Sequence, residues 1–176
     1  MDLVRKTLRH LLDTHEPYPA LVLDSVYDIQ MTNAAFRRVV AWAARSDALE
    51  SYSNIYRLTF ARDGLRNAVR DWTVVERFLL ARLQEEAVAT QHEALTDLYG
   101  EMAALGSGDD LDPADTQVDQ SLPILSFALE KAGRSAAFFS TITTFGTPLD
   151  VTTQELRIES LFPADEDTRR WLLKIA

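Results

Sequence analysis

The chain has 176 residues, of which 47% are hydrophobic, contains no cysteine and carries a formal net charge of −9. This length and composition fit one globular domain with a full core. The lack of cysteine excludes disulfide bonds, thiolate metal sites and cysteine nucleophiles, and the acidic charge disfavours binding of nucleic acid by this chain alone. No apolar run approaches the roughly 20 residues of a membrane span, and no signal peptide is recognisable, so we expect a cytoplasmic protein without a membrane partner.

The N-terminal part of the chain predicts a helix followed by a hairpin. Apolar residues recur at helical spacing over residues 2–14, and Pro17 ends this pattern. We interpret residues 1–16 as a connector helix. Residues 20–32 contain two short apolar runs separated by turn-forming residues, which predicts a β-hairpin. Asn33 follows at once and is a suitable N-cap for the next helix.

The middle of the chain is mainly helical by its periodicity. Apolar residues at helical spacing predict helices over about 73–89 and 91–105, with Val75 and Leu79 on an inward face. Residues 106–120 carry five aspartates and few apolar residues. Their spacing lacks the alternating ligands, central glycine and closing glutamate of an EF-hand, so we interpret this segment as a solvated acidic loop and expect no metal site.

The C-terminal third predicts a three-stranded antiparallel meander. Apolar residues alternate over 125–129, and a long second strand over 135–145 mixes phenylalanine with threonine on one face. The last strand, 156–162, places apolar residues on one face and charged residues, including Arg157 and Glu159, on the other. Such alternation is typical of a half-buried strand, so we expect its charged face to be exposed to solvent.

Together these elements predict an α+β fold. If the hairpin flanks the meander, the result is a five-stranded antiparallel sheet with helices packed on one face, which is the layout of a PAS-like domain. Small molecules bind in such a fold between the sheet and the helices. Pockets of this kind are mainly apolar with a few polar anchors.

No motif for catalysis or metal binding is present. His10, His15 and His92 form no i, i+4 pair and no zinc-binding HExxH motif. There is no nucleophile elbow, no phosphate-binding P-loop and no dinucleotide-binding glycine pattern. Glu155 and Glu159 share a strand face with an arginine between them, which we interpret as a solvated ladder rather than an acid/base pair. We therefore expect no enzymatic activity, no catalytic residue, no metal and no cofactor.

Several segments match a known family pattern. They are residues 18–24, 33–35, 54–60 and 64–66, Trp72 and, most specifically, 139–148, 150–152, 155–160 and 162–165. On these residues nearly the whole chain resembles the ligand-binding domain of MmyB-like transcription regulators, which are helix-turn-helix regulators of the XRE class. One departure is Tyr27, where the family usually carries a tryptophan.

The resemblance implies a PAS-like sensor that holds a hydrophobic small molecule, such as a fatty acid, behind an N-terminal DNA-binding domain. A helix-turn-helix needs roughly 60 residues ahead of the sensor, more than precede the first predicted strand here. We therefore expect residues 1–176 to form a single PAS-like ligand-binding domain, with the helix-turn-helix absent from this chain.

The hydroxyl-rich face of the second meander strand and the inward helix faces suggest where the ligand binds. The predicted site comprises Phe36, Val40, Trp72, Val75, Leu79, Phe127, Phe139, Thr141, Thr143 and Phe145, with Arg66 as a cation for a ligand carboxylate. Two alternatives stay open. One is an interaction module with a filled core that forms a homodimer through an exposed sheet face. The other is a small enzyme that uses Glu155, Glu159 or a threonine hydroxyl.

Overall fold

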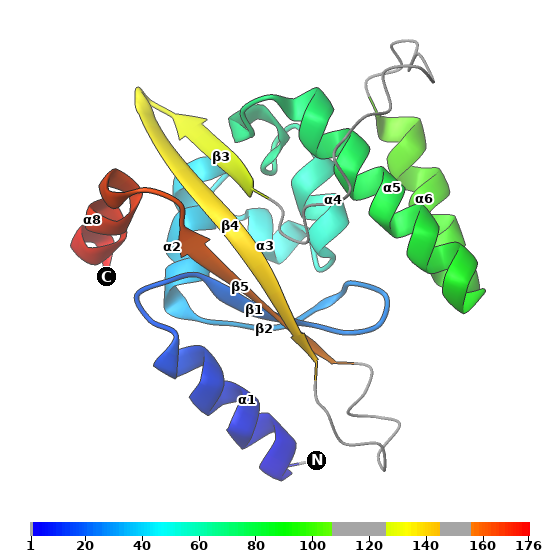
Figure 1. The fold of residues 1–176 in the computed structure, drawn as a ribbon, viewed down its shortest axis with the longest axis horizontal. Helices are drawn as coiled ribbons and strands as arrows, with labels where there is room; N and C mark the ends of the chain where they lie inside the picture. The colour runs from blue at the N-terminus through cyan, green and yellow to red at the C-terminus, as the bar shows by residue number, and fades with distance from the viewer. Residues whose placement is uncertain (1, 107–125, 145–155) are drawn as a thin grey trace.

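The computed structural model describes residues 2–106, 126–144 and 156–176 (Figure 1). At its centre is a five-stranded antiparallel sheet with strand order β2-β1-β5-β4-β3. The strands are β1 (Ala20–Leu23), β2 (Ile29–Thr32), β3 (Ser126–Lys131), β4 (Arg134–Thr144) and β5 (Arg157–Pro163). The N-terminal hairpin thus joins the last strand of the C-terminal meander, and the predicted α+β fold is confirmed.

The register of the sheet decides which side chains share a face. Leu21 of β1 lies opposite Glu159 of β5, and Glu159 lies opposite Ile142 of β4. Since cross-strand partners point to the same side of a sheet, these three form one row on one face. Val22 and Ile158, which are also partners, lie on the other face.

The helices surround this sheet. They are α1 (Asp2–Thr14), α2 (Ala34–Ala43), α3 (Ala48–Ser51), α4 (Ile55–Phe60), α5 (Trp72–Thr90), α6 (Glu93–Leu105) and α8 (Glu166–Ile175), with a short 3-10 helix, η1 (Arg66–Ala68). The predicted N-cap is confirmed, because the Asn33 side chain accepts a hydrogen bond from the Phe36 N–H. Asn54 caps α4 in the same way. None of the described helices combines the length and apolar character that a membrane crossing needs.

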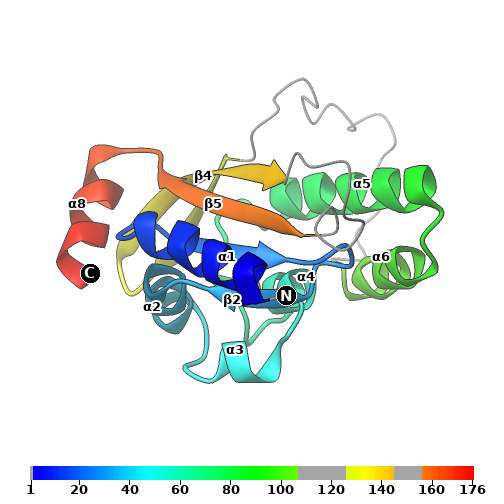
Figure 2. The same cartoon turned by 90° about the horizontal axis from the view of Figure 1, so that it is seen from below.

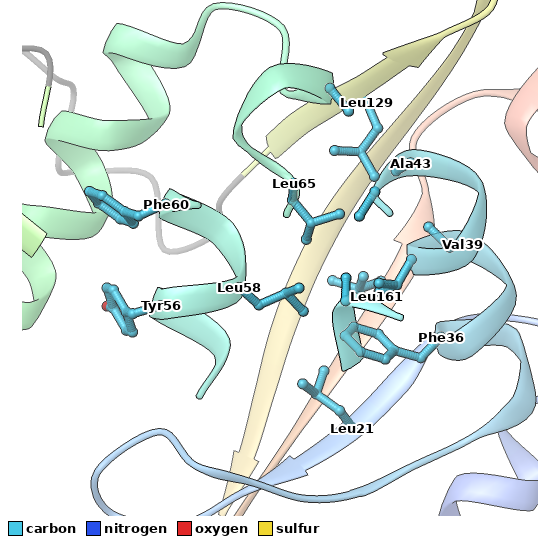
Figure 3. Packing of buried hydrophobic residues seen from close by; sticks show 14 of the residues in the cluster. Leu21, Phe36, Val39, Ala43, Tyr56, Leu58, Phe60, Leu65, Leu129 and Leu161 are labelled. Carbon is cyan, nitrogen blue, oxygen red and sulfur yellow. The ribbon is translucent and has the colours of Figure 1, made fainter. Parts of the chain in front are cut away.

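The main core lies between the inner face of the sheet and α2 and α4. Phe36 of α2 and Leu58 of α4 converge on Leu161 of β5, and each of these side chains is buried (Figure 3). Burying one such side chain contributes about 1.5–3 kcal/mol. Tyr56 and Phe60 leave the opposite side of α4, towards α5. Helices α5 and α6 pack along each other beside this core (Figures 1 and 2).

The outer face of the sheet is covered in part by α1 (Figure 2). Leu8 and Leu12 of α1 pack against Val22 and Ile158. The sequence predicted helices on one face, whereas α1 lies on the face opposite to α2 and α4. Apart from Gly106, the predicted acidic loop at 106–120 lies outside the described residues.

Candidate functional site

A mainly apolar cavity of about 100 Å³ lies between the inner face of the sheet and helices α2, α4 and α5. The sheet contributes Leu21, Phe127, Leu129, Ile142, Glu159 and Leu161 to its wall. The helices contribute Val40, Tyr56, Val75, Leu79 and Arg82, among others. An apolar wall with a few polar groups is the usual composition of a small-molecule site.

The size of the cavity limits what it holds without rearrangement. A dry protein cavity of about 150 Å³ binds benzene. The cavity observed here, at about 100 Å³, is smaller than that, so it fits a short alkyl group, and a ring or a longer chain requires one wall to move. Helix α5 packs mainly against α6, whereas α2 packs directly on β1 and β3, so α5 is held less closely to the sheet than α2.

Charged groups line the cavity from two elements. Arg82 follows Val75 and Leu79 on α5 at spacings of seven and three residues, which places all three on one helix face. Glu159 enters from β5, in the row that contains Leu21 and Ile142. Arg82 and Glu159 attract each other electrostatically.

The pKa of the Glu159 carboxyl is shifted by its position in the cavity wall. Burial raises the pKa of Glu159 above its ordinary value, although the positive charge of Arg82 and a hydrogen bond from Ser140 act in the opposite direction. The charged form of Glu159 is therefore stabilised less well in the fold than in water. The Glu159 carboxyl in the cavity wall therefore takes up a proton more readily than an exposed glutamate does.

A second polar cluster fastens α5 to the sheet next to the cavity. Arg157 of β5 donates two hydrogen bonds to Glu86 of α5, one of them at 3.0 Å, and the Tyr27 hydroxyl donates to the same carboxylate. The Arg157 guanidinium also lies 4.8 Å from the centre of the Tyr27 ring. Burial alone would raise the pKa of Glu86, but the hydrogen bonds from Arg157 and Tyr27 outweigh it and lower the pKa.

Four of the predicted site residues line this cavity. They are Val40, Val75, Leu79 and Phe127. Phe36 is buried in the adjacent core and is not part of the cavity wall.

Trp72 and Arg66 lie together outside the cavity. The Trp72 ring packs edge-on against Phe60, and the Arg66 guanidinium lies 5.1 Å from its centre. Arg66 also donates a hydrogen bond to the Leu105 carbonyl, so it is directed towards the end of α6 and away from the cavity.

The hydroxyl-rich face of β4 points away from the cavity. Phe139 stacks on Phe162 on the outer face of the sheet, and Thr141 and Thr143 lie on that same face. The cavity instead receives Ile142, from the other face of β4. Phe145 lies outside the described residues.

Sequence reasoning missed most of the polar residues of the cavity. Arg82, Tyr27 and Tyr56 were not proposed, and Glu159 was expected to be exposed to solvent. That expectation was wrong: Glu159 is partly buried and lines the cavity. The available signal was Leu161, an apolar residue two positions along β5 on the same face.

An α+β domain with an apolar cavity between sheet and helices defines a small-molecule-binding class of protein. Comparison with protein families makes this assignment specific, because the family described as "MmyB-like transcription regulator ligand binding domain" matches residues 4–174. The chain belongs to this family, as its motifs predicted. The family consists of regulatory ligand-binding domains and is not a family of enzymes. No curated protein was found to match the chain.

Proposed function

We propose that this chain is a PAS-like sensory domain of an XRE-class transcription regulator and that it binds a hydrophobic small molecule in the cavity. The observation that carries the proposal is the apolar cavity under α5 in a member of a ligand-binding family. A separate helix-turn-helix domain would supply the contact with DNA. The sensor would then act in the cytoplasm, where such regulators meet DNA.

The ligand class follows from the cavity wall. Val75, Leu79 and Leu129 offer an aliphatic surface suited to an alkyl chain or a small ring. Fatty acids are one member of this class. Because the cavity is small, a long chain would bind with displacement of α5, and the cluster of Tyr27, Glu86 and Arg157 would limit that displacement.

Signal transmission would run through two central strands. Leu21 of β1 and Leu161 of β5 line the cavity, while Val22 and Ile158 of the same two strands pack against α1 on the other face. A ligand that shifts the two leucines therefore changes the surface on which α1 rests. If α1 has two positions, the ligand would favour the one to which it binds more tightly, and the size of the shift is set by the difference between the two affinities.

The test is native mass spectrometry of the purified protein for bound lipid, followed by calorimetric titration with octanoic and dodecanoic acid, octan-1-ol and octanamide. A Leu79→Trp variant fills the cavity and is expected to lower affinity at least about tenfold, the effect of losing roughly 1.4 kcal/mol of binding free energy. Val88→Trp is the matched control, because Val88 is on the same helix but is 72% exposed. Absence of bound lipid together with no binding of any probe would refute the proposal.

Homodimer formation is a second candidate function. Leu3 and Leu11 of α1 are 76% and 41% exposed, although they lie on an amphipathic helix. A second copy of the chain would cover them by pairing α1 with α1. Light scattering coupled to size exclusion checks this, with Leu11→Glu expected to convert a dimer to a monomer, and a monomeric wild-type chain would exclude it.

A further inference from the structure

The polar end of the cavity carries one positive and one negative charge, so its net charge is zero. Arg82 supplies one positive charge and Glu159 one negative charge. Among the described residues, Arg82 has no hydrogen bond or ion pair at contact distance. The neighbouring charges, Glu86 and Arg157, are already joined by two hydrogen bonds and neutralise each other.

This balance disfavours a ligand that brings a charge of its own. A carboxylate bound to Arg82 would place a second negative charge beside Glu159 in a partly buried site, and like charges in such a site repel strongly. A hydroxyl or primary amide avoids this repulsion. It accepts a hydrogen bond from the Arg82 guanidinium and donates one to the Glu159 carboxylate, so both cavity groups gain a partner.

We propose that Arg82 and Glu159 form the polar-group subsite of the cavity and select an uncharged donor–acceptor group, a hydroxyl or a primary amide, over a carboxylate on the same alkyl chain. This inference rests on the proposed function, since it concerns the ligand of the same cavity. It gives Glu159 the role of a specificity-determining residue, which discriminates against anions.

The same geometry makes carboxylate binding depend on pH. The groups that face Glu159 are Arg82 from α5, Ser140 from β4 and Tyr56 from α4, with Tyr27 next to them. Burial raises the pKa of Tyr56 and of Tyr27, so both phenols stay neutral at and below pH 8. A carboxylate ligand would thus bind together with one proton, which Glu159 is placed to take up.

The experiment compares three ligands that share one chain: octanoic acid, octanamide and octan-1-ol. Calorimetric titration at pH 8 is expected to show octanamide and octanol binding at least about tenfold more tightly than octanoate. Between pH 6 and pH 8 the affinity for octanoate is expected to fall by up to about tenfold per pH unit, with the other two ligands unchanged. This pH series uses the wild-type chain and so does not depend on how any variant folds.

Two variants assign the effect to Glu159. Glu159→Gln removes the charge with almost no change of shape and is expected to close the gap between octanoate and octanamide at pH 8. Glu85→Gln removes the same charge from the exposed side of α5 and is expected to leave the gap intact.

The outcomes separate this inference from the proposed function. Octanoate that binds the wild-type chain as tightly as octanamide at pH 8, or a gap that persists in Glu159→Gln, would overturn the subsite assignment while leaving a ligand-binding cavity in place. Failure of all three probes to bind the folded wild-type chain would overturn both.

Discussion

Asn33 joins α1, the hairpin and α2, and replacing it by alanine provides a strong test of the fold. The side chain is 1% exposed. Its oxygen accepts hydrogen bonds from the N–H groups of Ala20 at 3.0 Å and Phe36 at 2.9 Å. Its nitrogen donates to the carbonyl oxygens of Tyr18 at 2.7 Å and Leu12 at 3.4 Å.

The magnitude follows from these contacts. Loss of the N-cap costs about 1 kcal/mol. The Ala20 N–H and the Tyr18 carbonyl lose their partner inside the protein, at about 1–3 kcal/mol for each unsatisfied group. The longer contact to Leu12 adds little. We therefore expect Asn33→Ala to lower the free energy of unfolding by about 3–7 kcal/mol.

Urea unfolding followed by circular dichroism measures this change. Asn67→Ala serves as the control, because Asn67 is exposed, and we expect it to alter the free energy of unfolding by no more than about 0.5 kcal/mol. A loss below about 1 kcal/mol in Asn33→Ala would show that the hydrogen bonds of Asn33 do not hold these elements together as argued.

Four further predictions concern glycines and charges. Gly100→Ala, on α6 with open space around it, should stabilise the protein by about 0.5–1 kcal/mol. Gly64→Ala should cost at least about 2 kcal/mol, because its Cβ would lie 2.1 Å from a carbonyl oxygen of α4, and equal melting temperatures for the two variants would contradict this. Arg157→Met should cost about 1–3 kcal/mol at pH 7, since it leaves Glu86 partly buried without its cation. The pKa of Glu86 is lowered in the fold, so the loss of stability in Arg157→Met is present above the pKa of an unfolded glutamate and should vanish as the pH falls through the folded pKa. Urea unfolding that gives the same loss at pH 7 and pH 3 would count against this prediction. Glu159→Gln should show the opposite pH dependence, because the pKa of Glu159 is raised in the fold and the carboxyl destabilises the protein once the pH rises through that pKa. The variant should therefore be more stable than wild type at pH 7 but not at pH 3. A variant less stable than wild type at pH 7 would refute the reasoning.

The sheet could be predicted from the sequence because its signals are local. Alternation in the last strand, turn residues between the runs and a suitable N-cap at Asn33 each depend on a few neighbouring residues. The family motifs lie in these same segments. Five strands and their antiparallel pairing followed from this information.

The face of β5 that borders the cavity could not be predicted in this way. Alternation separates two faces but does not say what covers each of them. Here α1 covers the face of Ile158, and the charged face of Glu159 lies under α5, where Arg82 provides a counter-charge. Both facts depend on contacts between segments that are far apart in the sequence.

Arg82, the positively charged residue of the cavity wall, could have been predicted from the sequence. Arg82 continues the face of Val75 and Leu79, so helical spacing alone places it beside them. Arg66 has no such relation to the inward residues, because it begins a three-residue 3-10 helix. Following the helix face beyond its apolar residues would have favoured Arg82.

The burial of β1 couples the cavity to the docking of α1. All four of its residues are buried, with Leu21 on the cavity side and Val22 against α1, so a change at either position disturbs the cavity and the docking of α1 together. Helix α5 is less constrained, because Leu79 and Arg82 reach the cavity from a helix that packs on α6 and is partly exposed, for example at Glu85 and Val88. What the domain senses can therefore diverge through α5, while the way in which it reports the signal stays fixed in the hairpin.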